Sequence, residues 1–87
     1  MKIEEGFILR EAAGKTMVVA VGPAMEKFSG IITLNSPSVF LWRILEKGAT
    51  EEQLVSALLN EYDVSEEVAK KDVKDFVAKL VSANVIK

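Results

Sequence analysis

The spacing of apolar residues changes at Ser36, and this change constrains the fold more than any other feature. Before it, aliphatic residues form short runs separated by turn residues, which is typical of strands. After it, apolar residues recur every three or four positions, which is typical of amphipathic helices. The sequence therefore predicts an α+β fold, in which a three-stranded antiparallel meander in residues 4–35 precedes a three-helix bundle in residues 36–84. We expect residues 1–87 to form a single domain with a winged helix-turn-helix-like order.

The strand-like half divides into three predicted strands, at residues 6–10, 15–21 and 30–34. Ala13-Gly14 is the expected turn between the first two. Gly22-Pro23 ends the second strand, because proline cannot continue a ladder of hydrogen bonds. We expect a loop from there to Phe28, with Met25 and Phe28 packing back onto the core.

The boundaries of the three helices follow from capping residues. Ser36 is the expected N-cap of the first helix, with Pro37 at its first position and Gly48 after its end. Thr50 and Gln53 match a capping box at the start of the second helix. Ser65 is expected to cap the third helix, whose buried positions are predicted to be Ala69, Val73, Phe76, Val77 and Leu80. Asn84 can close that helix in a left-handed conformation, so that Val85-Ile86 folds back as a plug or short strand.

The composition excludes several classes of chemistry. The chain has no cysteine and no histidine, which removes disulfides, thiolate nucleophiles and the usual general base. No catalytic set, metal site or cofactor site is predicted, and we expect a protein that is not an enzyme. The net charge of −2 argues against general affinity for nucleic acid. Without a signal peptide or a long apolar run, we expect a cytoplasmic protein with no membrane partner.

The third predicted strand is the first candidate binding element. If it lies at the edge of the sheet, its unpaired backbone groups can bind a peptide as a further strand. The candidate residues are Gly30, Ile31, Ile32, Thr33 and Leu34. An alternative interpretation remains open, in which this is an ordinary edge strand covered by the loop around Phe28.

The third helix carries the second candidate. Most of its lysines have an acidic residue four positions away, in the pairs Glu66 with Lys70, Glu67 with Lys71 and Asp75 with Lys79. Lys74 has none three or four positions away. The strip formed by Lys70, Lys74, Val77 and Val81 is basic at one end and apolar at the other, which suits an amphipathic, partly acidic peptide. A solvated helix face is the alternative. Trp42 could belong to an interface, but packing under a neighbouring helix is the favoured interpretation.

Several stretches of the sequence, in the right order, match a known family. They are Gly6-Phe7-Ile8-Leu9-Arg10, Leu34-Asn35, Phe40-Leu41-Trp42, Gly48-Ala49-Thr50, Glu61-Tyr62-Asp63-Val64, Asp72-Val73 with Phe76 and Leu80, and Asn84-Val85-Ile86. On these residues the chain resembles the PqqD family of coenzyme PQQ synthesis and the wider set of RiPP recognition elements. Family members usually have glycine where this chain has Asn84, and asparagine tolerates the same backbone conformation.

This resemblance implies binding of the leader segment of a ribosomally made precursor peptide. In such domains the leader pairs along the third strand and lies against the third helix, and a partner enzyme, often a radical SAM protein, then modifies the rest of the peptide. The resemblance does not separate the PQQ pathway from another RiPP pathway.

Two other functions remain open from the residues alone. A winged-helix transcriptional regulator would use the third helix to read DNA, although the acidic balance opposes this. A structural assembly subunit would use the apolar run from Met17 to Val21 in a homodimer. We therefore expect either a monomer or a weak homodimer.

Overall fold

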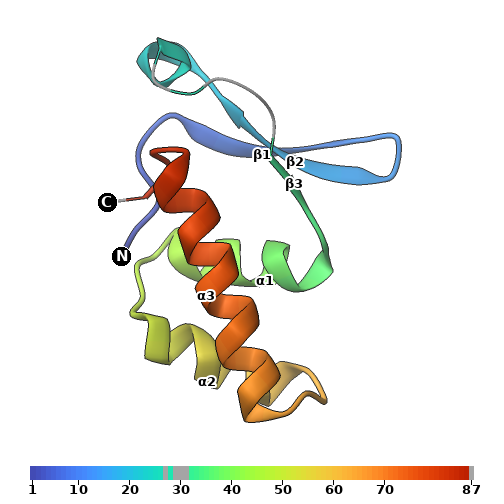
Figure 1. Ribbon diagram of the computed structural model, residues 1–87. Helices are drawn as coiled ribbons and strands as arrows, with labels where there is room; N and C mark the ends of the chain where they lie inside the picture. The colour runs from blue at the N-terminus through green and yellow to red at the C-terminus, as the bar shows by residue number, and fades with distance from the viewer. Residues whose placement is uncertain (27, 29–31, 87) are drawn as a thin grey trace.

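The computed structural model describes residues 1–26, 28 and 32–86 (Figure 1). Its elements, in chain order, are β1 (Phe7–Ala12), β2 (Lys15–Ala20), the 3₁₀ helix η1 (Gly22–Glu26), β3 (Ile32–Leu34), α1 (Ser36–Leu45), α2 (Glu51–Glu61) and α3 (Glu66–Ser82). The predicted order of strands followed by helices is confirmed. The segment after β2 differs from the prediction, because it forms η1 and not an irregular loop.

The three strands form one antiparallel sheet in the order β1-β2-β3. The β1–β2 hairpin closes at the pair Ala12↔Lys15, so the turn consists of Ala13 and Gly14 alone, as predicted. Both turn residues have positive φ, 53° and 77°. This is the requirement of a type I′ turn, whose twist matches that of the flanking strands.

The segment around η1 corrects one prediction and confirms another. Phe28 packs edge-on against Phe7 of β1, with ring centroids 5.3 Å apart and planes at 82°. Met25 does not fold back, because its side chain is 64% exposed. Gly6 makes room for η1 beside β1, since a Cβ on it would lie 2.7 Å from the Cβ of Ala24.

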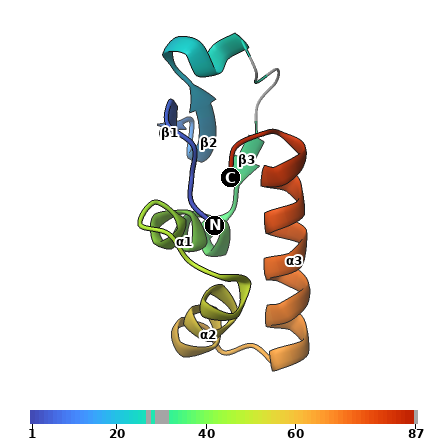
Figure 2. The same cartoon turned by 90° about the vertical axis from the view of Figure 1, so that its left-hand side faces the viewer.

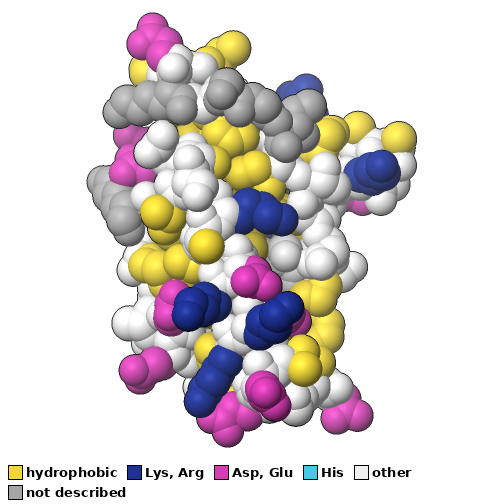
Figure 3. Space-filling model, in the orientation of Figure 1, with side chains coloured by type: hydrophobic (Ala, Val, Ile, Leu, Met, Phe, Trp, Pro, Cys, Tyr) yellow, Lys and Arg dark blue, Asp and Glu magenta, His cyan; other side chains and the backbone are white. Residues whose placement is uncertain are grey.

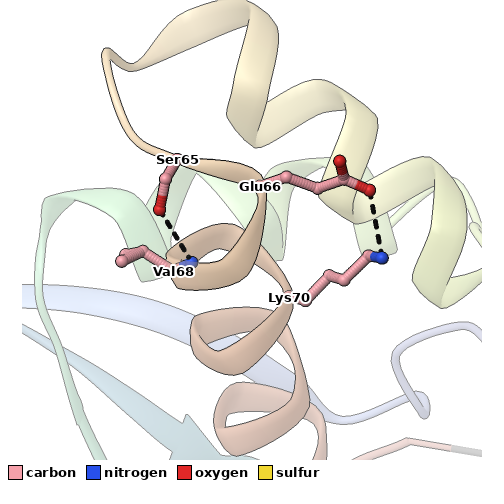
Figure 4. A network of polar contacts seen from close by, with 4 residues as sticks. All are labelled: Ser65, Glu66, Val68 and Lys70. Carbon is pink, nitrogen blue, oxygen red and sulfur yellow. Dashed lines mark hydrogen bonds and ion pairs between the residues drawn. The ribbon is translucent and has the colours of Figure 1, made fainter.

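Capping side chains set the helix starts, and one differs from the prediction. The N-cap of α1 is Asn35 and not Ser36, because the Asn35 side chain accepts a hydrogen bond from the Ser38 amide at 2.9 Å. Ser36 then lies inside the first turn, where Pro37 also fits because the amides there have no partner within the helix. The predicted capping box of Thr50 and Gln53 is confirmed by bonds in both directions, of 2.9 and 3.1 Å. Ser65 caps α3 through the Val68 amide at 3.2 Å, as predicted (Figure 4).

The core lies between the inner face of the sheet and the helices, and α3 runs past α2 and α1 towards the sheet (Figure 2). All five positions of α3 that were predicted to be buried are buried. Trp42 is 0% exposed, so it packs in the core and does not belong to an interface. Its indole N–H has no hydrogen-bond partner within the described residues.

The end of α3 closes the domain. Asn84 has a φ of 61°, and the Asn84 and Val85 amides donate to the carbonyls of Val81 and Leu80. This is a Schellman motif, which confirms the left-handed role of Asn84. Val85 is then fully buried, and Ile86 pairs with Ile3 in an antiparallel bridge. The predicted plug is therefore present, and Ile86 forms an isolated bridge and not a strand.

Candidate peptide-binding site

Strand β3 is an edge strand. Its one partner among the described strands is β2, through the pairs Thr16↔Leu34, Met17↔Thr33 and Val18↔Ile32. Its side chains alternate, with Ile32 half-buried against the core, Thr33 exposed and Leu34 buried. The other edge of β3 therefore carries backbone N–H and C=O groups that a further strand can pair with.

A hollow of about 190 Å³ begins where β3 ends. It is bounded by Leu34 and by the start of α1, and by α2 and α3 on the far side. Apolar side chains from three helices, Leu41, Leu58 and Phe76, line it together with charged side chains of α3. The further lining residues are Asn35, Pro37, Ser38, Asp72, Asp75 and Lys79. We call this hollow, together with the edge of β3, the β3–α3 groove.

The sequence positions of the groove residues on α3 explain why they share a face. Asp72, Asp75, Phe76 and Lys79 follow the spacing i, i+3, i+4, i+7, which places side chains above one another along a helix. Phe76 is 5% exposed and anchors this face on the core. The three charged side chains consequently stand at the border of an apolar floor, an arrangement that suits a peptide with both apolar and charged residues.

The predicted site residues divide into four groups. Ile32, Thr33 and Leu34 form β3 itself, whereas Gly30 and Ile31 lie outside the described residues. Val77 is buried in the core, so its side chain is occupied by packing. Lys70, Lys74 and Val81 are exposed and do not line the groove.

Helix geometry separates the predicted strip from the groove. With 3.6 residues per turn, the residues Lys70, Lys74, Val77 and Val81 centre about 180° around α3 from the groove residues. The contact of this strip with a peptide stays a prediction. Asp72, Asp75 and Lys79 were not predicted from the sequence as site residues. Acidic and basic residues at helical spacing are also typical of an ordinary solvated helix face. Their spacing relative to Phe76, which places them on one helix face with a large apolar residue, was the sequence feature that could have indicated the groove.

The surface charges of α3 are arranged in local pairs. Lys70 pairs with Glu66 at 3.0 Å, as predicted (Figure 4). Lys71 pairs with Asp75 at 3.8 Å, which corrects the predicted pairs of Lys71 with Glu67 and of Asp75 with Lys79. Both observed pairs are well exposed, so each contributes at most about 1 kcal/mol to stability. On the face seen in Figure 3, positive and negative side chains alternate over the helical half and do not gather into one basic patch.

The described residues were searched for clusters of metal-binding side chains and for helices able to span a membrane. Within residues 1–26, 28 and 32–86, no group of three or more acidic, cysteine or histidine side chains is placed to hold a metal ion. In the same part of the chain, no helix has the length and hydropathy needed to cross a membrane. The candidate site consists of an open strand edge, an apolar floor and a few charged side chains.

Comparison with known proteins gives the chain a family. A search of curated protein sequences returns no match. The fold is similar to that of a solved structure of TbiB1 in complex with the TbiA(β) leader peptide, with a TM-score of 0.76 and 21% identity over 100% of this chain and 95% of that one. It is also similar to lasso peptide synthetase B1 complexed with the leader peptide, with a TM-score of 0.69 and 16% identity over 93% and 89% of the two chains. The model of the family described as coenzyme PQQ synthesis protein D matches residues 7–86, and the chain therefore belongs to the PqqD family.

Proposed function

We propose that this protein binds the leader segment of a ribosomally made precursor peptide and presents that peptide to a modifying enzyme. The observation that carries the proposal is the open edge of β3 beside a groove lined by α3. An extended leader would add to the sheet as a fourth strand, through backbone hydrogen bonds that do not depend on its sequence. Its side chains would be selected by the apolar floor and the charged border of the groove.

The comparisons support this proposal at the level of the fold. Both similar structures are complexes with leader peptides, and the family is one of coenzyme PQQ synthesis. The modifying partner would be a maturation enzyme such as a radical SAM protein. We propose a role in recognition and not in catalysis, and the lack of histidine and cysteine supports this part of the proposal. The net charge of −2 gives little support to the alternative of a DNA-binding regulator.

Two faces of α3 are candidates for contact with the leader. The groove face, with Asp72, Asp75 and Lys79, is better supported because it shares a hollow with Leu34 of β3. The strip of Lys70, Lys74 and Val81 remains a proposed contact for a leader that crosses to the other side of the helix. The two alternatives place different charged side chains next to the peptide, so they can be separated by experiment.

The test of strand addition is an NMR titration of the isotope-labelled protein with the leader half of a precursor peptide encoded beside its gene. We expect amide shifts and new hydrogen-exchange protection at Ile32, Thr33 and Leu34. The amides of β1, which forms the other edge of the sheet, serve as an internal control and should not gain protection. Protection on β1 in place of β3, or no shifts at all, would contradict the proposal.

The test of the α3 face compares two substitutions of the same kind. Lys79→Glu reverses a charge in the groove, and Lys74→Glu reverses a charge in the predicted strip. Because both lysines are exposed, neither change should alter folding. For a groove-bound leader, Lys79→Glu should change the leader Kd by about threefold or more, while Lys74→Glu leaves it nearly unchanged. The reverse result would assign the leader to the strip.

A further inference from the structure

The sheet has a second apolar surface, on the face that points away from the core. Ile8 of β1 is 42% exposed and Val21, directly after β2, is 43% exposed. Met17 and Val19 are half-buried, but they are not among the side chains that pack against the core. We call Ile8, Met17 and Val19, with Val21 at the margin, the outer sheet face.

Strand alternation explains why these residues share a face. Phe7, Val18 and Leu34 are buried against the helices, so their neighbours in sequence point to the opposite side. The register places Ile8 directly opposite Val19 and Met17 directly opposite Thr33, which brings them together across all three strands. In both cartoon views α1 and α2 lie on the other side of the sheet (Figures 1 and 2). Neither α1 nor α2 therefore covers this apolar cluster.

The charges on the outer sheet face all have the same sign. Arg10 lies opposite Met17, and Lys15 is the next residue of β2 on the same face as Met17. The described strand positions that point to this side, 8, 10 and 12 on β1, 15, 17 and 19 on β2 and 33 on β3, include no acidic residue. The face is thus apolar with a basic border, although the whole chain carries a net charge of −2.

This charge arrangement selects the kind of partner. A second copy would bring Arg10 and Lys15 of both chains to one interface with no carboxylate on it, and like charges in an interface are unfavourable. An apolar surface bordered by Asp and Glu side chains would satisfy both the apolar cluster and the two cations. We infer that the outer sheet face docks such a surface on the modifying enzyme, an inference that rests on the proposed function.

The position of β3 links this surface to the leader. A leader paired along β3 would extend the sheet, and alternate leader side chains would project on the same side as Thr33. An enzyme on the outer sheet face would then contact the domain and the bound leader together. Enzyme and leader should therefore bind cooperatively, and each should raise the affinity of the other by the same factor.

The test measures binding of the purified modifying enzyme encoded beside the gene, with and without saturating leader peptide. Two variants alter the outer sheet face: Arg10→Glu combined with Lys15→Glu, and the isosteric Val19→Thr. The control is Lys47→Glu, an exposed lysine after α1 that lies on neither surface. We expect the charge-reversed variant to weaken enzyme binding by about tenfold or more and Val19→Thr by a smaller factor, with the control unchanged. Circular dichroism of each variant establishes that it is folded.

Leader affinity separates failure of this inference from failure of the proposed function. Normal leader binding by all variants, with weaker enzyme binding only in the outer-face variants, supports the inference. Normal leader binding with equal enzyme binding by every variant overturns it and leaves leader recognition intact. A wild-type dimer in light scattering that dissociates in the outer-face variants would assign the face to a second copy and also overturn it. Absence of leader binding by the wild type would overturn the proposed function itself.

Discussion

The turn of the β1–β2 hairpin contains a residue that is unfavourable for its backbone conformation. Ala13 has a φ of 53° in a two-residue turn that needs positive φ at both positions. The left-handed conformation costs a residue with a Cβ about 1–2 kcal/mol. Asparagine is among the few residues that tolerate it, because its side chain can form a local hydrogen bond. Since Ala13 is exposed, substitution does not disturb the core.

Ala13→Asn should therefore raise the free energy of unfolding. Asparagine adopts the left-handed conformation at a lower energetic cost than alanine, so we expect the free energy of unfolding to increase by about 0.5–1 kcal/mol. For a domain of this size that gain corresponds to an increase in Tm of about 2–8 °C. Ala13→Gly should give less, because glycine also increases the entropy of the unfolded chain by an amount equivalent to about 0.4–1 kcal/mol.

Urea unfolding followed by tryptophan fluorescence measures this change directly. Trp42 is the one tryptophan of the chain and is fully buried, so its emission reports the loss of the core. The matched control is Ala12→Asn, at the neighbouring exposed strand position, where asparagine is disfavoured and a small loss is expected. If Ala13→Asn were no more stable than the wild type, or if both variants gained equally, the argument from backbone conformation would be refuted.

Two further predictions use the same unfolding assay. Asn35→Ala should lower stability by about 1 kcal/mol because it removes the N-cap of α1, whereas Ser36→Ala should change it by less than about 0.5 kcal/mol; equal effects would contradict the cap assignment. Gly6→Ala should cost about 2–4 kcal/mol, because φ is +94° and the new Cβ meets Ala24 at 2.7 Å. Gly14 also has positive φ but open space around it, so Gly14→Ala should lose only the stability that the strained backbone costs. An equal loss of stability in both variants would show that the contact with Ala24 is unimportant.

Features set by a few neighbouring residues were predictable from the sequence. The capping box of Thr50 and Gln53, the cap at Ser65 and the left-handed Asn84 each depend on contacts within five residues. The start of α1 was displaced by one residue because asparagine and serine, both good caps, are adjacent there. The sequence alone does not indicate which of the two adopts the extended backbone of an N-cap.

Features set by long-range packing were less predictable. The rotation of α3 about its axis depends on how it packs against α2, and this rotation decides which charged side chains border the groove. Met25 illustrates the same limit, since its apolar character indicated burial but η1 holds it at the surface. The edge position of β3 follows from the strand order of the predicted meander, which is confirmed.

The bridge between Ile3 and Ile86 has a consequence for how the chain acquires its structure. The two residues are at opposite ends of the sequence, and the Glu4 amide also donates to the Val85 carbonyl at 2.7 Å. Closing a loop of nearly the whole chain carries a large entropic cost, so this contact should form late, after the hairpin and the helices. On the ribosome, the segment around Ile3 and Glu4 would have to wait for the last residues to emerge, whereas β1 can pair with β2 earlier. Joining the two ends without opening the chain elsewhere would make that late contact local and leave the β1–β2 hairpin local, so such a cyclised chain should fold faster than the open one.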